Sequence, residues 1–522
     1  MVAISQSRMK RLVAIHGWSG TILGLLLYVV IVTGAVAVFA HEIGLWSQGG
    51  EKYSATLTEP IDAYIRKVAA TVDQEFYGEI SIWKGTDGTL TVFFHTHKQN
   101  PETGQIDDYG VDIDLNPETG ETLARKEGFG SWLRNADPSN ALERFLIDLH
   151  VRLYIPEPWG LILTGVLGLL VLAASVSGFL MHRHMFRDIF YAPKTLRRLV
   201  DMRDRHTLVS TWLLPFSLVL GFTGAFFSFA ESIGLPVVAT VAFKGDQMAM
   251  METLVGHEHA SETTPHHGVS IDTVLQDATA RIKTAPTLLT IENWGTSAME
   301  LITLHNPQDG DLTGQQLAFN GMDGSFIGQI PSFGTSPSLG SAAIDLMGPL
   351  HFGDFSGLAS KIIWFALGLG MAYTVASGLQ FWVRRRADSQ GWLIYERAID
   401  TLIWGLPICM LVSALSYFVS IPSGSASFWT PAGFVITALI LIPVGLSFRS
   451  AGSLMRSLTI ALCISLPILR QSITGADWIT LIQNVQLTVI AADAILILCG
   501  LTLLTKTFQN WMPRKTAGKP AE

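Results

Sequence analysis

Eight long apolar segments dominate the pattern of hydrophobic and polar positions along the chain. Each is roughly 20 residues long, which an α-helix needs to cross the ~30 Å hydrocarbon core of a bilayer. The pattern therefore predicts a polytopic α-helical membrane protein. Its predicted spans cover residues 14–40, 157–181, 207–230, 358–383, 399–420, 430–448, 455–470 and 484–505.

Two long polar insertions interrupt this pattern, at residues 42–145 and 231–345. The pattern within each insertion predicts a helix, then strands of alternating polarity, and finally a strand that ends in a glycine turn. The first insertion has these elements at Ile61–Glu75, Ile80–Trp83, Leu90–His95 and Val111–Gly120, and the second has them at Ile271–Ile282, Leu288–Glu292, Met299–Leu304 and Leu317–Gly324. Each insertion is therefore expected to be a small α+β domain.

These elements divide the chain into eight predicted parts. In chain order, the parts are a first span (1–41), an outer domain (42–145), a second span with the segment before it (146–181), a basic loop (182–206), a third span (207–230), a second outer domain (231–345), a fourth span with the segment before it (346–383) and a four-helix membrane extension (391–510).

Charge adds an orientation to this membrane protein. Only 15% of the residues are charged, against about 25% in ordinary proteins. Lys and Arg gather in short loops on one side of the spans, which marks that side as cytoplasmic. These residues are Arg183, Arg187, Lys194, Arg197, Arg198, Arg203, Arg205, Arg384, Arg385, Arg386, Arg449, Arg456, Lys506 and Lys515. Both termini are then cytoplasmic, and both insertions face the periplasm if the membrane is the inner membrane of a Gram-negative bacterium.

The first apolar run also has features of a secretory signal peptide, because basic residues precede it and Ala35-Val36-Ala37 resembles a cleavage site. Its length is about twice that of a typical signal h-region. It also has a copy within the chain, at residues 206–234. We therefore expect it to remain as a span.

A duplication places histidines at equivalent points of the two halves. His16 precedes a Thr-Gly pair at Thr33-Gly34, and His206 precedes Thr223-Gly224 in the same register. His150 lies 28 residues before Gly178, within Val-Ser-Gly, and His351 lies 27 residues before Gly378, within Ala-Ser-Gly. Ionisable groups in membrane segments are costly and usually functional. Histidines at the ends of duplicated membrane helices are typical axial ligands of haem.

The depth of each histidine in the membrane predicts how the four pair. His16 and His206 open spans that start in the cytoplasm, whereas His150 and His351 precede spans that start outside. We therefore expect two haems, one per leaflet, ligated by His16 with His206 and by His150 with His351. Gly20 and Gly24 lie on the His16 face of the first helix and could leave room for a porphyrin. Small residues also serve close helix packing, as could those of the second helices: Gly165, Gly168, Ser175, Gly178, Gly368, Gly370, Ser377 and Gly378.

Other histidines are alternative ligands. His182 and His184 end the second span and could replace His16 or His206, or simply flank the basic loop. His41 ends the first span, but its repeat partner is Glu231, so it ranks as a spare ligand or a substrate contact.

Several polar and aromatic residues near the outer face are further candidates. Arg144 and Arg152 flank His150, so one of them could pair with a haem propionate. His95 and His97 lie on one face of a strand, because strand side chains alternate, and could contact a metal or an anionic chelate. Trp132, with Trp46 and Trp159, could form an aromatic platform or an ordinary interfacial belt. Arg144 and Arg152 could instead face water or lipid headgroups, and His95 and His97 could simply be exposed on the sheet. The His-rich stretch of His257, His259, His266 and His267 could capture a metal ion or form a disordered linker.

Missing motifs exclude several classes. The three cysteines lie in late apolar segments, and no Cys-x-x-Cys-His occurs, which excludes the usual c-type haem attachment and a cysteine-ligated iron–sulfur cluster. No strand-bounded Gly-x-Gly-x-x-Gly or P-loop is present, so electrons must come from quinol or from a separate cytoplasmic reductase. Nothing indicates a nucleic-acid partner.

The helix, strands and Asn-Pro-x-Thr-Gly-like turn of each insertion resemble the PepSY domain. PepSY domains between helices that carry His, Thr-Gly and Ser-Gly resemble the PepSY-associated transmembrane family, over about residues 8–390. The resemblance implies a b-type haem protein of the inner membrane, because known members include ferrisiderophore reductases that hold b-type haem.

We therefore expect a di-haem b-type electron carrier that reduces a periplasmic acceptor, most in keeping with the family a ferric siderophore. The alternatives are a PepSY regulatory or assembly protein without redox chemistry, and a transporter. The apparent lack of buried acidic residues in the spans argues against a proton-coupled transporter. The last four spans carry no histidine and could stabilise the bundle, bind quinol or recruit a partner.

Overall fold

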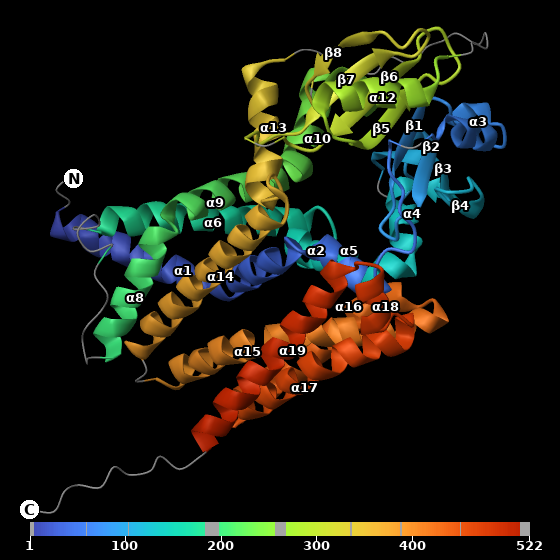
Figure 1. Cartoon of the computed structure of the whole chain (residues 1–522). Helices are drawn as coiled ribbons and strands as arrows, with labels where there is room; N and C mark the ends of the chain where they lie inside the picture. Colours follow the sequence, from blue (N-terminus) through green and yellow to red (C-terminus); the bar gives the residue numbers. More distant parts are fainter. Residues whose placement is uncertain are drawn as a thin grey trace, which may run out of the picture. The chain divides into compact units, whose positions relative to one another are not determined.

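Among the residues that the structure describes, eight helices are long and apolar enough to cross a membrane (Figure 1). The structure is a computed structural model that describes residues 5–511 except 59, 103, 183–189, 191–197, 256–267, 309, 333, 335–336, 387–388 and 449. The candidate spans are Gln6–Ala37, Trp159–Met181, Leu214–Ala242, Gly357–Arg384, Gln390–Ser423, Ala426–Ser447, Ala451–Thr474 and Leu487–Thr507. The predicted multi-pass membrane protein with eight spans is confirmed.

The third span differs from its predicted bounds of 207–230. A helix α8 (Arg198–Trp212) stops at Leu213, and α9 (Leu214–Phe229) begins anew there. Pro215 causes this break, because proline has no N–H to donate and is tolerated in the first turn of a helix. The span then continues through a π-helical turn (Ala230–Gly234) into α10 (Leu235–Ala242).

The two polar insertions form one continuous antiparallel sheet of eight strands, in the order β4-β3-β2-β1-β5-β6-β7-β8. The first four strands come from the first insertion and the last four from the second. The strands are β1 (Glu79–Lys84), β2 (Leu90–Gln99), β3 (Ile106–Leu115), β4 (Thr122–Phe129), β5 (Pro286–Glu292), β6 (Glu300–His305), β7 (Gln315–Asn320) and β8 (Phe326–Ile330). The expected strands are present, and β4 and β8 were not predicted.

The sequence predicted two separate α+β domains, and on this point the structure differs. Strand β1 pairs with β5, with Glu79 opposite Glu292 and Trp83 opposite Leu288. An edge strand leaves a row of backbone hydrogen-bonding groups without partners, and here the edge of each half satisfies the edge of the other.

One helix from each half covers the same face of the sheet. These helices are α3 (Asp62–Ala69) and α12 (Ile271–Ile282), and their apolar sides share one hydrophobic core with residues such as Ile80, Phe94 and Phe319. The two N-termini cap one another: Asp272 Oδ1 accepts from the Asp62 backbone N–H at 3.0 Å, and Asp62 Oδ1 accepts from that of Ile271 at 2.9 Å. This reciprocity reflects the duplication seen in the sequence.

Further short elements connect the sheet and the spans. They are α2 (Ala40–Gln48), α4 (Gly130–Ala136), α5 (Ala141–Arg152), α11 (Gln247–Val255), α13 (Leu339–Phe352), α18 (Trp478–Gln483) and the 3₁₀ turns Gln74–Phe76, Pro138–Asn140 and Ile421–Ser423. The remaining long helices are α1 (Gln6–Ala37), α6 (Trp159–Met181), α14 (Gly357–Arg384), α15 (Gln390–Ser420), α16 (Ala426–Ser447), α17 (Ala451–Thr474) and α19 (Leu487–Trp511).

The chain divides into two compact units. One contains residues 1–41, 51–140 and 146–379, and the other contains residues 42–50, 141–145 and 380–522. Residues 42–50 and 141–145 fall within the predicted first outer domain (42–145), whereas the structure groups them with the C-terminal helices. Their side chains explain the grouping, because Trp46 bonds to Asp493 and Phe145 packs against Phe434.

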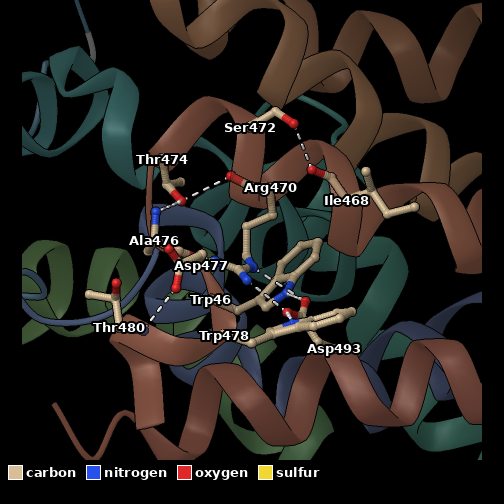
Figure 2. Close-up of polar contacts among 10 residues, drawn as sticks. All are labelled: Trp46, Ile468, Arg470, Ser472, Thr474, Ala476, Asp477, Trp478, Thr480 and Asp493. Atoms are coloured by element: carbon tan, nitrogen blue, oxygen red, sulfur yellow. Dashed lines mark hydrogen bonds and ion pairs between the residues drawn. The ribbon is translucent and has the colours of Figure 1, made fainter. Parts of the chain in front are cut away.

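A buried ion pair lies at the centre of this second unit (Figure 2). Arg470 and Asp493 have side chains 0% and 2% exposed, with Nη2 2.7 Å from Oδ2. The indole N–H groups of Trp46 and Trp478 donate to the two carboxylate oxygens at 2.8 and 2.9 Å. The expectation that the spans lack buried acidic residues is therefore wrong: Asp493 is buried in α19, where a cation and two indoles hold it.

Candidate functional site

Four histidines form two close pairs in the first unit, one edge-on and one stacked. The ring centroids of His16, on α1, and His206, on α8, are 6.4 Å apart with an interplanar angle of 73°. Those of His150, on α5, and His351, on α13, are 6.1 Å apart at 25°. The structure brings together the same partners that membrane depth predicts. His150 and His351 lie on short helices of their own, ahead of the spans α6 and α14.

This spacing suits one metal ion between two imidazoles. A metal about 2 Å from each coordinating nitrogen, with each ring centre roughly 1 Å further out, separates the two centroids by about 6 Å. Both pairs have this separation.

Hydrogen bonds fix the tautomer at the first pair. His206 Nδ1 lies 3.0 Å from the carbonyl oxygen of Thr374, which can only accept, so Nδ1 carries the proton. His16 Nδ1 lies 2.9 Å from Ser177 Oγ, whose own hydroxyl donates to the Ala174 carbonyl. Ser177 therefore accepts from His16, and both rings keep Nε2 as the free lone pair.

The second pair follows the same rule. His150 Nδ1 donates to the Val30 carbonyl at 3.0 Å. His351 Nδ1 lies 2.9 Å from Thr223 Oγ1, whose hydroxyl donates to the Val219 carbonyl. A metal-binding histidine usually donates its other N–H to such an acceptor, which orients the ring and raises its basicity. All four histidines thus have Nδ1 engaged in a hydrogen bond, which leaves the Nε2 lone pair available to a ligand.

The duplicated glycines explain why small residues recur at these points. A Cβ added to Gly34 would lie 2.6 Å from His150 Cε1, and one on Gly378 would lie 2.9 Å from His206 Cε1. For Gly224 the distance to His351 Cε1 is 3.3 Å, and for Gly178 the distance to His16 Cε1 is 3.8 Å. Gly34, Gly378 and, by a smaller margin, Gly224 therefore leave space for a histidine ring, whereas a Cβ at Gly178 would make only an ordinary contact.

The other predicted glycines divide between the two roles. At Gly20, an added Cβ would meet open space beyond its own helix backbone and chain neighbours, and a role beside a cofactor stays a prediction. At Gly24 the Cβ would lie 2.9 Å from Leu379 Cδ2, so this glycine serves the packing of α1 against α14. Gly165 and Gly168 likewise pack against Phe229 and Ala225 of α9.

The structure places the described alternative ligands, His182 and His41, outside the two histidine pairs. His182 caps the end of α6, and its Nδ1 is buried with no hydrogen-bond partner among the described residues. His184 lies outside the described residues. His41 is exposed on α2, just after α1 ends.

The basic candidates for haem propionates already have partners. Arg152 forms ion pairs with Asp148 at 2.9 Å and with Glu157 at 2.6 Å. Arg144 donates to Ser427 at 3.5 Å.

The burial of Trp46 contradicts the predicted aromatic platform of Trp46, Trp132 and Trp159. Trp46 is 4% exposed and bonded to Asp493, because it belongs to the core of the second unit. Trp132, on α4, is 36% exposed and packs edge-on against Phe129, and Trp159 is 68% exposed. A role for Trp132 in substrate contact stays a prediction.

His95 and His97 lie on one face of β2, as the strand pattern predicts. They face Asp108 and Glu79 of the neighbouring strands. Burial lowers the pKa of His95, against the opposing effects of Glu79 and Asp108. The His-rich stretch from His257 to His267 lies outside the described residues.

The two histidine pairs are well separated along the bundle. His150 contacts α1 at Val30 and Gly34, whereas His16 lies 14 to 18 residues earlier on the same helix. At 1.5 Å per residue this corresponds to roughly 21–27 Å. The pairs can therefore hold two separate groups, one toward each end of the spans.

Comparison with known proteins identifies the family. The family model described as the PepSY-associated TM region matches residues 13–385, which is most of the chain. The protein therefore belongs to this family. An uncharacterized protein of Pseudomonas aeruginosa is 24% identical over 400 residues, which cover 72% of this chain and 96% of that relative.

Proposed function

We propose that the protein carries electrons across the membrane through two b-type haems and reduces a ferric chelate on the outer side. The observation that carries this proposal is the pair of facing imidazoles at each of two levels, all four with Nδ1 bound and Nε2 available. His16 and His206 would hold the haem nearer the cytoplasm, and His150 and His351 the haem nearer the periplasm.

Bound haem supplies one-electron transfer, while the protein sets its position and potential. Ser177, Thr374, Val30 and Thr223 keep the four imidazoles in the ligating tautomer. The motif glycines let the rings lie close to the neighbouring helices. The structure thus supports a preorganised ligand set at each site.

The direction of transfer follows from the basic loops. They support an inner-membrane protein with cytoplasmic termini and a periplasmic sheet. The donor is then quinol or a cytoplasmic reductase, because the sequence has no motif for a soluble nucleotide cofactor. A ferric siderophore suits the outer position, because reduction of Fe(III) to the softer Fe(II) weakens binding by hard oxygen ligands and releases the iron.

A haem count on histidine variants tests the ligand assignment. Purified wild-type protein should give a b-type reduced-minus-oxidised spectrum and about two haems per chain. The pair variant His16→Ala/His206→Ala should keep one haem, whereas the cross variant His16→Ala/His150→Ala should lose both. His305→Gln, which changes a buried histidine of the sheet, is the matched control and should keep two. Haem-free wild-type protein from cells with ample haem would instead favour a regulatory or assembly role.

A second experiment tests the acceptor. Dithionite-reduced protein is mixed anaerobically with ferric siderophores, and haem reoxidation is followed together with the Fe(II) formed. Stoichiometric Fe(II) supports reduction of ferric chelates. Haem that stays reduced with every chelate would keep the electron carrier and point to another acceptor.

A further inference from the structure

The face of the sheet opposite α3 and α12 carries a second group of side chains that can ligate a metal, far in sequence from the membrane histidines. The strand register places His97 opposite Asp108 and His95 opposite Glu79. Residues directly opposite in an antiparallel pair point to the same face, so β1, β2 and β3 contribute to one cluster. His95, His97 and Asp108 each offer a ligand atom within 4.8 Å of the others.

We propose that His95, His97 and Asp108 bind a divalent transition-metal ion, and that Glu79 orients both imidazoles. Asp108 Oδ1 lies 3.8 Å from His95 Nδ1 and 2.9 Å from His97 Nδ1. Ligands of a tetrahedral Zn²⁺ are about 3.3 Å apart, given bonds of roughly 2.0–2.1 Å. The carboxylate oxygen is therefore close to the required spacing from each Nδ1, and one ligand atom of each residue lies within 4.8 Å of the other two.

Glu79 completes the arrangement from the opposite side of the imidazoles. Its two oxygens each lie 3.7 Å from one Nε2, Oε1 from that of His95 and Oε2 from that of His97. A carboxylate behind a metal-bound imidazole fixes its orientation and raises its basicity. Two histidines and one carboxylate also leave one coordination position open for water or a small anionic ligand.

His95 provides the independent sign of a ligand. It is 3% exposed, and its Nδ1 is buried with no hydrogen-bond partner among the residues that the structure describes. The ring is stacked on Phe93 with centroids 4.5 Å apart, so it is held with Nδ1 toward Asp108. A buried polar atom without a partner is costly, and a bound metal ion would satisfy it.

The neighbouring charges favour a cation at this place. Glu79 lies opposite Glu292, which in turn lies opposite Glu300, so three acidic residues stand in a row across β1, β5 and β6. Like charges directly opposite one another destabilise a sheet. A divalent ion at the His95 end of this row would reduce that repulsion.

Zinc binding to the full-length protein in detergent tests the site. The variants are made in a background with His257, His259, His266 and His267 replaced by Ala, so that this stretch adds no zinc. After treatment with a chelator, Zn²⁺ affinity is measured by competition, with the metal counted. The background protein should bind one zinc per chain at the sheet. His95→Gln and Asp108→Asn should weaken binding more than about 100-fold, and Glu79→Gln by about 10- to 100-fold.

A matched control and a direct structural readout separate binding from misfolding. His305→Gln removes another buried sheet histidine, which bonds to Thr284 and Thr303, and should leave zinc affinity unchanged. In His97→Cys, the extended X-ray absorption fine structure of the bound zinc should show one sulfur ligand at about 2.3 Å. Wild-type zinc affinity in both His95→Gln and Asp108→Asn, an equal loss in His305→Gln, or a zinc without sulfur in His97→Cys would each overturn the proposal. All variants keep the membrane histidines, so any zinc held there is common to them and cancels in the comparison, and the sheet site can fail while the proposed function holds.

Discussion

Thr223 accepts a hydrogen bond from Nδ1 of His351 at 2.9 Å, while its own proton goes to the Val219 carbonyl. This contact joins a duplicated Thr-Gly motif to a duplicated histidine. Thr223→Val removes the acceptor with little change of shape, so that under the proposed function the imidazole would be a weaker donor to ferric iron. We expect the potential of one haem to rise by some tens of millivolts, on the order of the 59 mV of a tenfold change in a one-electron equilibrium.

The measurement is a redox titration of the haem spectrum with both haems still bound. Thr240→Val is the control, because Thr240 is exposed on α10 and bonds only within its own helix at Pro236. Equal potentials in Thr223→Val and wild type would contradict a role of Thr223 in tuning the ligand.

Gly34 and Gly178 allow a matched steric test. An added Cβ meets His150 Cε1 at 2.6 Å in the first case, and His16 Cε1 at an ordinary 3.8 Å in the second. Both changes raise helix propensity by about 1 kcal/mol, so a general helix effect cannot separate them. Gly34→Ala should lose most of one haem and Gly178→Ala should keep both, as measured by the haemochrome count. Loss in both variants, or in neither, would refute the steric argument.

The histidine pairs show how far sequence patterns reach. Register and membrane depth predicted that His16 faces His206 and that His150 faces His351, because a duplicated fold repeats its contacts. The helix that carries His351 was not predicted, because α13 contains Pro349 and merges with the polar segment before the span. The acceptors of the four Nδ1 protons come from other helices, and two of them are backbone carbonyls that leave no mark in the sequence.

The sheet shows the same limit. Alternating polarity predicted most strands, but β8 has mainly exposed side chains and no alternation to detect. The pairing of β1 with β5 joins segments about 210 residues apart, and nothing local specifies it. Asp493 was missed for a related reason, since its partners Trp46 and Arg470 lie on other segments.

Asp493→Asn tests the ion pair of the second unit. The substitution leaves Arg470 buried without its counter-charge, and breaking a buried pair in this way typically costs about 3–5 kcal/mol. We expect a clear fall in the unfolding temperature in detergent, as measured by the intrinsic tryptophan fluorescence of the protein. The double variant Arg470→Met/Asp493→Leu should be less destabilised, because it removes both charges together. An equally unstable double variant would show that side-chain shape, and not the unpaired charge, matters there.

The raised pKa of Asp112 predicts that the stability of the folded protein depends on pH. Burial, with a contribution from nearby Asp114, raises the pKa of this carboxyl from 3.8 to about 6. The folded state then binds more protons than the unfolded state between about pH 4 and 6, so stability falls as pH rises through this window. Asp112→Asn should therefore stabilise the protein at pH 7–8 by about 1 kcal/mol, a value reduced for partial solvent screening.

Denaturant unfolding at pH 4 and pH 8 measures this effect. The gain should disappear at the lower pH, where the wild-type carboxyl is also neutral. Glu118→Gln, in an exposed turn, should change stability little at either pH. A gain of equal size at both pH values would point to packing and not to the carboxyl charge.

The pairing of β1 with β5 also has a consequence for biosynthesis. When the first insertion emerges from the ribosome, β5 is about 210 residues away, and two further spans must be inserted before it appears. At about 5–20 residues per second, translation of that interval takes roughly 10–40 s. During this interval the backbone groups on the β5-facing edge of β1 have no native partner strand, and such an edge is prone to wrong pairing. A chaperone that holds exposed strands would be needed most during this interval.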